Sequence, residues 1–302
     1  MADLAERYMA EHARPKKRPS SARTDASNLR IHVLPALGRK RVAVVTRADI
    51  ADLHHAMRET PGAANRTLAL VSKMMNLAEK WGLRPDASNP CRHVERYRER
   101  KMERFLATEE LARLGTVLSE AERTATELPS VIAAIRLLIF TGARLGEILN
   151  LQWRDVDIKR ACLRLPESKT GAKVIHLNAP ALEVLNGLER SEHNPWVIAG
   201  REPEKPLVNL RKPWHRIRKA AEIEDMRLHD LRHSFASVGV AGGLSLPMIG
   251  ALLGHAQPAT TVRYAHLAAD PLKQAVDLIG ERIAAAMKGG RGEVVELNKS
   301  KR

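Results

Sequence analysis

Long hydrophobic runs, cysteines and aromatic residues are all scarce in this chain of 302 residues. It contains no stretch of about 18 consecutive apolar residues, so no membrane-spanning helix is predicted. The first 13 residues are charged and contain no apolar segment of the kind that a secretory signal requires. The two cysteines, Cys91 and Cys162, match neither a metal-ligand spacing nor a disulfide framework. These absences predict a cytoplasmic protein without a membrane partner.

Acidic residues are too few to balance the basic ones. The chain has 50 lysines and arginines against 35 aspartates and glutamates, a net charge of +15. The excess is uneven, because residues 1–104 hold 22 basic and 12 acidic side chains. Such a charge predicts a polyanionic partner, namely DNA, RNA or an acidic membrane surface, although a basic protein with a solvated face has the same composition. Because this region carries most of the excess charge, we expect the first third of the chain to be the part that binds DNA.

Apolar residues recur with helical spacing along most of the chain. Pro35 and Gly38 are expected to break the chain after the second helix, and Thr46 with Asp49 forms a capping box that opens the third. The predicted helices cover residues 3–12, 21–32, 46–58, 63–81, 107–120, 129–140, 144–151, 179–188, 210–221, 232–241, 246–253, 260–267 and 271–288.

A strand pattern replaces the helical one in a single region. Short strands are predicted at residues 156–158, 161–165 and 173–177, with a turn at 168–171 between the last two. The predicted fold is therefore mainly α with a small antiparallel β-sheet. We expect four segments: a helical DNA-binding domain (residues 1–95), a basic linker (96–104), an α+β catalytic domain (105–288) and a C-terminal tail (289–302).

The predicted helix over residues 63–81 has one basic edge. Arg66, Lys73 and Lys80 recur every seven residues, so they stack along one side of the helix, apart from its apolar face. A basic edge on a packed helix suits contact with DNA phosphates or entry into the major groove. An ordinary solvated face would show the same pattern.

Tyr264 is the only tyrosine of the second predicted domain. It lies beside Arg263 and close in sequence to two histidines, His255 and His266. A phenol surrounded by basic groups could serve as a nucleophile toward a phosphodiester. Taken alone, this tyrosine is better explained by packing in a core that is poor in aromatic residues.

Further basic residues could each act on a phosphodiester or have a purely structural role. Arg144 lies between apolar helices, where it needs an anion; Glu147, three residues on, could supply one as a buried pair. His229 and Arg232 share one helical face, where a guanidinium fork could grip phosphate oxygens and an imidazole could move a proton, although His229 could also cap the helix. Lys169 is expected at the tip of the strand pair, where it could reach a leaving group or simply face solvent.

Taken together and in this order, these residues resemble the tyrosine recombinase, or phage integrase, family. That family carries an Arg, a Lys, a His-x-x-Arg pair, a His or Trp, and a Tyr. The corresponding motifs here are ARLGE, SKTG, HDLRH, LLGH and TTVRYAHL, with Tyr264 nine residues after His255. The resemblance spans residues 105–270 and extends more weakly over residues 1–104, which look like the family's helical core-type DNA-binding domain.

The resemblance implies a role for each matching residue. Tyr264 would attack phosphorus to give a 3′-phosphotyrosine, while Arg144, Arg232 and His255 would bind the non-bridging oxygens. His229 would assist removal of the tyrosine proton, and Lys169 would protonate the leaving 5′-oxygen. Glu147 would orient the basic cluster. No metal or other cofactor is expected.

The resemblance also implies partners. These are double-stranded DNA at core-type attachment sites, three further copies of the chain in a synaptic tetramer, and accessory DNA-bending proteins. Integration or excision of a mobile element is the expected task. A Xer-like dimer resolvase, a type IB topoisomerase-like enzyme and a non-catalytic DNA-binding regulator are the alternatives.

Both ends of the chain carry a prediction. Residue 1 starts almost directly in the core-binding region, so either the sites are simple or an arm-binding domain is missing from this chain. Near the other end, the last predicted helix has an apolar stripe that could dock on a neighbouring copy or on its own domain. The stripe comprises Leu272, Val276, Ile279, Ile283 and Met287.

Overall fold

The computed structural model describes residues 1–99, 103–168, 171–191, 193–268, 276–277 and 279–284. The chain divides into two compact units, Met1–Met102 and Glu103–Arg302, and each has its own hydrophobic core. Among the described residues, no helix is both long enough and apolar enough to cross a bilayer.

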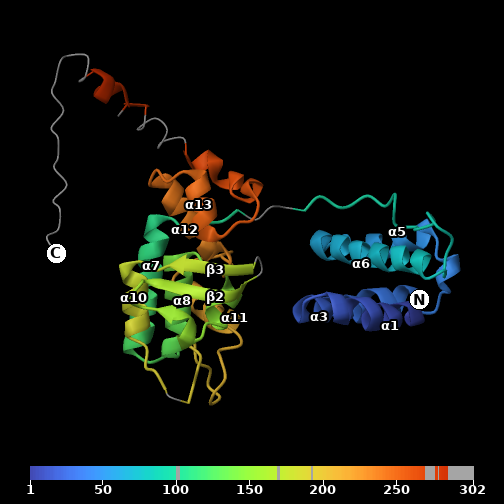
Figure 1. The fold of residues 1–302 in the computed structure, drawn as a ribbon, viewed down its shortest axis with the longest axis horizontal. Helices are drawn as coiled ribbons and strands as arrows, with labels where there is room; N and C mark the ends of the chain where they lie inside the picture. The colour runs from blue at the N-terminus through green and yellow to red at the C-terminus, as the bar shows by residue number, and fades with distance from the viewer. Residues whose placement is uncertain (100–102, 169–170, 192, 269–275, 278, 285–302) are drawn as a thin grey trace. The chain divides into compact units, whose positions relative to one another are not determined.

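The first unit is built from helices in its described residues, and its longest helix, α6, contacts α1, α5 and the turn η2 (Figure 1). Tyr8, Ile50 and Met74 are among the side chains buried between them. The elements are α1 (Ala2–Tyr8), the π turn η1 (Met9–Ala13), α2 (Arg14–Lys16), α3 (Pro19–Asn28), the π turn η2 (Leu29–Val33), α4 (Leu34–Leu37), the 3-10 turn η3 (Val42–Val44), α5 (Arg47–Ala56) and α6 (Pro61–Lys80).

The two π turns explain why the prediction of a break at Pro35 was wrong. Each π turn is followed two residues later by a proline, Pro15 after η1 and Pro35 after η2. Proline has no N–H and its ring clashes with the carbonyl one turn earlier, so it disrupts a regular α-helix. The wider π turn moves that carbonyl aside. The chain therefore continues in helical form to Leu37.

The predicted start of α5 is confirmed. The Thr46 hydroxyl accepts from the Asp49 N–H at 3.3 Å, and the Asp49 carboxylate accepts from the Thr46 N–H at 2.9 Å. This reciprocal pair satisfies two N–H groups that the first helical turn leaves free.

The second unit combines helices with one small sheet (Figure 1). Its core centres on α8, which is buried along most of its length and contacts α7, α9, α10 and α12. The elements are α7 (Thr108–Arg123), α8 (Pro129–Thr141), α9 (Leu145–Leu149), the 3-10 turn η4 (Trp153–Asp155), β1 (Val156–Asp157), β2 (Cys162–Ser168), β3 (Gly171–His176), α10 (Ala179–Asn186), α11 (Arg211–Ala220), α12 (Asp230–Ala241), α13 (Leu246–Leu253) and the 3-10 segments η5 (Pro258–Thr260) and η6 (Val262–Ala268).

The sheet has the order β1-β2-β3 and is antiparallel throughout. Leu163 pairs with Ile175, and both side chains are buried in the core of the second unit. Strand residues alternate between faces, so this register turns the intervening residues away from the core. The predicted fold class, mainly α with a small antiparallel sheet, is confirmed.

The segment that carries Tyr264 differs from the prediction. It forms 3-10 helix over Pro258–Thr260 and Val262–Ala268 instead of an α-helix. Pro258 and the β-branched run Thr260–Val262 disfavour a regular α-helix, which accounts for the tighter turns. Of the last predicted helix, residues 276–277 and 279–284 are helical. The rest of that helix, with Leu272 and Met287, and the tail at 289–302 lie outside the described residues.

Candidate active site

The end of α13 organises the predicted catalytic residues. α13 stops at Gly254, whose φ of +65° is a left-handed conformation that glycine adopts without strain. The carbonyl oxygens of Leu253 and Gly254 therefore keep free lone pairs at the negative end of the helix dipole. Leu253 accepts from Arg232 Nη2 at 2.6 Å and Lys173 Nζ at 3.3 Å, and Gly254 accepts from Arg144 Nη2 at 3.3 Å. Three cations thus meet at one helix terminus.

Glu147 is the carboxylate of this cluster. It lies on α9 and accepts from the Arg144 backbone N–H at 2.9 Å, from Arg144 Nη1 at 2.8 Å and from Lys173 Nζ at 3.1 Å. Burial alone would raise the pKa of Glu147, but the hydrogen bonds from Arg144 and the charge of Lys173 outweigh it and lower that pKa. The carboxylate is therefore ionised, and the structure places it between the two cations.

Arg232 is the most deeply buried cation of the cluster, with 4% of its surface exposed. Its Nη1 donates to the Gly142 carbonyl at 2.7 Å, at the point where Gly142 ends α8. Burial and the neighbouring charge of Arg144 lower the pKa of Arg232 to about 10, so it stays charged at neutral pH. A buried guanidinium held by neutral carbonyls can exchange them for an anion.

Tyr264 is buried, and its phenol oxygen lies 2.5 Å from Nδ1 of His233. Burial raises the pKa of Tyr264, while the charges of Arg263 and Arg232 oppose that rise. The family resemblance gives His229 the role of assisting removal of the phenol proton. In the described part of the structure the hydrogen-bond partner is His233, and His229 packs edge-on against it with ring centroids 5.0 Å apart.

His255 follows directly after the end of α13. Its Nδ1 lies 2.8 Å from the Thr261 hydroxyl, which orients the ring, and no hydrogen bond links Nε2 to the residues that the structure describes. Burial and the charges of Arg232 and Arg144 lower the pKa of His255 to about 4. The imidazole is thus neutral at pH 7 and could donate from Nε2 if the proton resides there.

The structure brings together Arg144, Glu147, Arg232, His255 and Tyr264 through the α13–η6 region. Lys169, at the predicted turn, lies outside the described residues.

Sequence reasoning missed His233 and Lys173. His233 is four residues after His229 and so lies on the same side of α12, a spacing that could have indicated it. Lys173 follows SKTG on β3, and no local pattern marks it as buried.

The three basic residues predicted to contact DNA lie on α6 in the first unit. Arg66, Lys73 and Lys80 are all exposed, whereas the opposite side of α6 buries Leu68, Val71 and Met75 among others. Partial burial together with the charge of Lys73 lowers the pKa of His12, so α1–η1 contributes to the surroundings of this basic edge.

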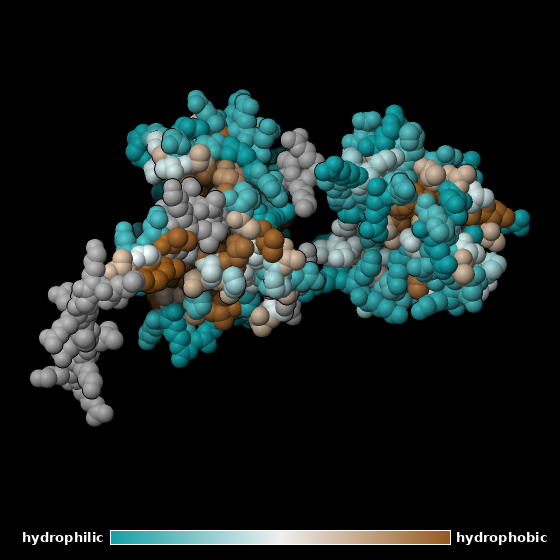
Figure 2. Space-filling model, turned by 90° about the horizontal axis from the view of Figure 1, so that it is seen from above, coloured by the Kyte–Doolittle hydropathy of each residue, from teal (hydrophilic) through white to brown (hydrophobic). Residues whose placement is uncertain are grey.

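Hydrophobic side chains gather on the face of the second unit seen in Figure 2. An apolar groove of about 690 Å³ lies between α7, α8, α12 and α13, and its lining includes Leu118, Phe140, Phe235 and Leu252. Val238 and Leu244, at its edge, are 57% and 39% exposed. An exposed apolar surface of this kind is typical of a protein–protein contact.

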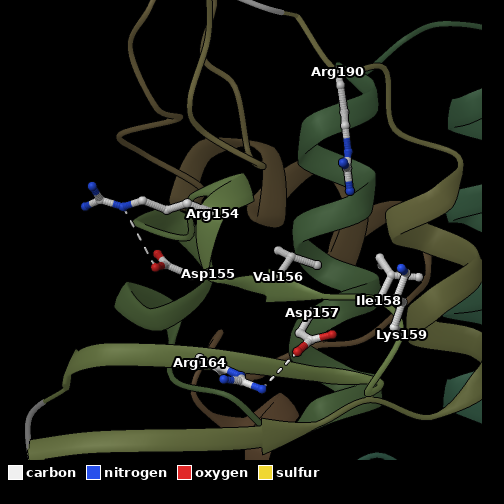
Figure 3. Close-up of a pocket in the computed structure, with 8 residues that line it drawn as sticks. All are labelled: Arg154, Asp155, Val156, Asp157, Ile158, Lys159, Arg164 and Arg190. Carbon is white, nitrogen blue, oxygen red and sulfur yellow. Dashed lines mark hydrogen bonds and ion pairs between the residues drawn. The ribbon is translucent and has the colours of Figure 1, made fainter.

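A separate cavity of about 430 Å³ lies against β1 (Figure 3). Its arginines are partly neutralised, since Arg164 pairs with Asp157 at 2.9 Å and Arg154 lies 3.9 Å from Asp155. Of the predicted site residues that the structure describes, none lines it. Nor do the described residues contain a group of three or more acidic, histidine or cysteine side chains placed to hold a metal ion.

Known proteins are similar to this chain in both sequence and fold. The family model described as phage integrase family matches residues 104–270. The integrase of Salmonella phage P22 is 29% identical over 171 residues, which is 51% of this chain and 44% of that protein. Tyrosine recombinase XerA of Saccharolobus solfataricus is 31% identical over 162 residues, 52% of this chain and 51% of that one. The match therefore spans about half the length of these relatives.

A solved structure of a lambda integrase fragment (residues 75–356), a dimer bound to a COC′ core site, has the same fold. Its TM-score is 0.71 at 18% identity, and the match covers 100% of this chain and 99% of that one. Because the family model takes in more than half of the chain and every motif of the cluster, this protein belongs to the phage integrase family.

Proposed function

We propose that this protein is a site-specific DNA recombinase that cleaves and rejoins DNA through a phosphotyrosine at Tyr264. The observation that carries the proposal is a buried phenol that feels the charge of Arg232, a member of a cluster of cations whose partners among the described residues are carbonyl oxygens and one carboxylate. A phosphodiester repels nucleophiles with its negative charge, so its attack needs cations around the phosphorus. The chain supplies these cations and the nucleophile from one small region.

The reaction follows from these residues. The Tyr264 oxygen bonds to phosphorus while the bond from phosphorus to the 5′-oxygen breaks, leaving a 3′-phosphotyrosine. Arg144, Arg232 and His255 donate to the non-bridging oxygens and stabilise the charge that grows on them. His229 assists removal of the phenol proton.

The leaving group needs a proton of its own. Lys169 protonates the leaving 5′-oxygen, so the cleaved strand ends in a hydroxyl. Attack on the phosphotyrosine by that hydroxyl, or by the 5′-hydroxyl of a partner strand, rejoins the DNA and releases Tyr264. The energy of the broken bond stays in the phosphotyrosine, so no nucleotide cofactor is required.

Partners follow from charge and exposed surface. The basic edge of α6 binds the phosphates of a core-type site, and copies of the chain assemble as a tetramer on two duplexes. The described part of the apolar stripe supports this assembly, since Val276, Ile279 and Ile283 are 66%, 56% and 55% exposed in the single chain. Accessory DNA-bending proteins could assist. The setting would be the cytoplasm.

The biological task that we favour is integration or excision of a mobile element. Relatives of both kinds occur, an integrase and a Xer recombinase, so dimer resolution is the second candidate. Incubation with two differently labelled duplexes distinguishes either recombinase from a topoisomerase-like enzyme. A recombinase exchanges strands between the duplexes, whereas a topoisomerase-like enzyme would relax DNA without exchanging strands.

A nicked suicide substrate tests the chemistry. We expect a denaturant-stable protein–DNA adduct with the native chain and with Tyr97→Phe, which removes a phenol from the first unit. Tyr264→Phe should give none. An adduct that persists in Tyr264→Phe would refute the assignment of the nucleophile, and DNA binding without any adduct would indicate a regulator.

A further inference from the structure

His233 lies between the phenol of Tyr264 and the guanidinium of Arg263. Its Nδ1 is 2.5 Å from the Tyr264 oxygen, and its Nε2 is 3.5 Å from Arg263 Nη1. The imidazole is 7% exposed, so protein groups supply its surroundings. Both ring nitrogens are therefore engaged, one by the proposed nucleophile and one by a residue adjacent to it in sequence.

The Arg263 contact decides which nitrogen carries the proton. A guanidinium has only N–H donors and no acceptor, so the atom facing it must offer a lone pair. Nε2 is then unprotonated, and the proton of the neutral ring is on Nδ1. Burial and the charges of His229 and Arg263 lower the pKa of His233 to about 4, which keeps the ring neutral at pH 7. Consequently Nδ1–H donates to the Tyr264 oxygen.

We propose that Arg263 is a positioning residue that fixes His233 in the Nδ1–H tautomer, so that His233 donates a hydrogen bond to the oxygen of Tyr264. This inference rests on the proposed function of Tyr264 as nucleophile. Glu103 is a second partner of this guanidinium, because its carboxylate lies 4.0 Å from Arg263 Nη2.

The consequence for the chemistry is specific. In this tautomer His233 cannot accept the phenol proton, which must leave toward another base such as His229. His233 instead stabilises the negative charge that the phenol oxygen carries after its proton has left and before the bond to phosphorus is complete. When the strand is rejoined, the same N–H stabilises Tyr264 as the departing phenolate. No proton is gained or lost by His233 in either direction.

Nitrogen chemical shifts of ¹⁵N-labelled histidine test the proposal without reference to activity. The His233 signals are assigned by their loss in His233→Gln. We expect the Nδ1–H tautomer in the native chain and in Arg263→Lys, which keeps a donor. In Arg263→Leu the ring should change to the Nε2–H form that free histidine favours. Arg216→Leu, which removes a surface arginine paired with Glu127, should leave the native tautomer unchanged.

Two outcomes overturn the proposal. An Nε2–H ring at His233 in the native chain refutes the geometry. An Nδ1–H ring that persists in Arg263→Leu shows that Arg263 does not set it.

Adduct formation gives a second readout. We expect Arg263→Leu to slow it on the order of 10²-fold, with recovery in Arg263→Lys. Should Tyr264→Phe still form the adduct, the proposed nucleophile fails while the tautomer result stands, so the two failures are distinguishable.

Discussion

Arg232 donates from Nη2 to the carbonyl oxygen of Leu253 at 2.6 Å, although the two residues are 21 positions apart. The other arm of the same guanidinium reaches the Gly142 carbonyl at 2.7 Å. One side chain therefore ties the end of α8 to the end of α13. Arg232 has a structural role in addition to the one that we propose for it on DNA.

Arg232→Met should destabilise the second unit. The substitution leaves two buried carbonyl oxygens without these donors, and each such loss costs about 1–3 kcal/mol. We expect the free energy of unfolding in urea to fall by about 2 kcal/mol or more. Arg123→Met, which breaks an exposed pair with Glu120 on α7, should change it by less than about 0.5 kcal/mol. Equal effects for the two variants would contradict the structural role.

Gly254→Ala should disturb the cluster more than an equivalent change elsewhere. A Cβ at residue 254 would lie 2.9 Å from Lys173 Cε, in addition to the strain of a positive φ. Gly243 also has a positive φ, +86°, but no atom lies within 4 Å of its would-be Cβ. We expect Gly243→Ala to cost about 1–2 kcal/mol from backbone strain alone and Gly254→Ala to cost more. Thermal unfolding compares them; equal losses would show that Lys173 is not confined.

Glu147 and Lys173 should be energetically coupled. Their side chains are 6% and 8% exposed and lie 3.1 Å apart, so removing one leaves the other buried with less compensation. Glu147→Gln alone should cost about 3–5 kcal/mol. A double-mutant cycle with Lys173→Met should return an interaction energy of about 1–3 kcal/mol. Strictly additive single effects would show that Arg144 alone satisfies Glu147.

Stability should decrease as the pH falls from about 6.5 toward 4. The pKa values of His233 and His255 are lowered from 6.5 to about 4, so between these values the unfolded chain binds protons that the folded chain excludes. Urea unfolding at pH 7.5 and pH 5.0 measures the loss. His255→Gln should reduce it, whereas His215→Gln, at an exposed position, should not. The opposite trend, with stability rising at pH 5.0, would contradict the burial of these rings.

Neutralising the basic edge of α6 should reduce the salt dependence of DNA binding. If Lys73 contacts one phosphate, Lys73→Gln lowers the slope of log K against log salt by about 0.9. Arg58→Gln removes an exposed charge that lies outside α6 and is paired with Glu59, and it should leave the slope nearly unchanged. Identical slopes for native chain and Lys73→Gln would place the DNA elsewhere on the first unit.

Most of the fold could be predicted, because it depends on local patterns. The almost wholly apolar residues of α8 and the Thr46–Asp49 capping box are visible in the sequence itself. The two π turns were missed, because sequence rules treat Pro35 as a helix breaker and cannot show that the preceding turn widens to accommodate it. The 3-10 form of the Tyr264 segment was missed for a similar reason, since β-branched residues weaken an α-helix without specifying its replacement.

The sequence predicted which residues form the candidate site better than it predicted which of them contact one another. Motif order identified Arg144, Arg232, His255 and Tyr264, but assigned the phenol to His229. Which histidine of α12 faces Tyr264 depends on how η6 packs against that helix, a tertiary contact that spacing along one helix cannot determine. Lys173 shows the same limit, because its burial depends on where α13 ends.

The cluster at the end of α13 contains three cations, Arg144, Lys173 and Arg232, and one carboxylate, Glu147. It therefore keeps a net positive charge that attracts anions. The carbonyls that occupy the donors are uncharged and can be displaced by any small tetrahedral oxyanion of suitable size. Inorganic phosphate or sulfate in a buffer would thus compete for the donors that we propose for the DNA phosphate. The protein's apparent affinity for its site would then depend on which salt is present as well as on how much.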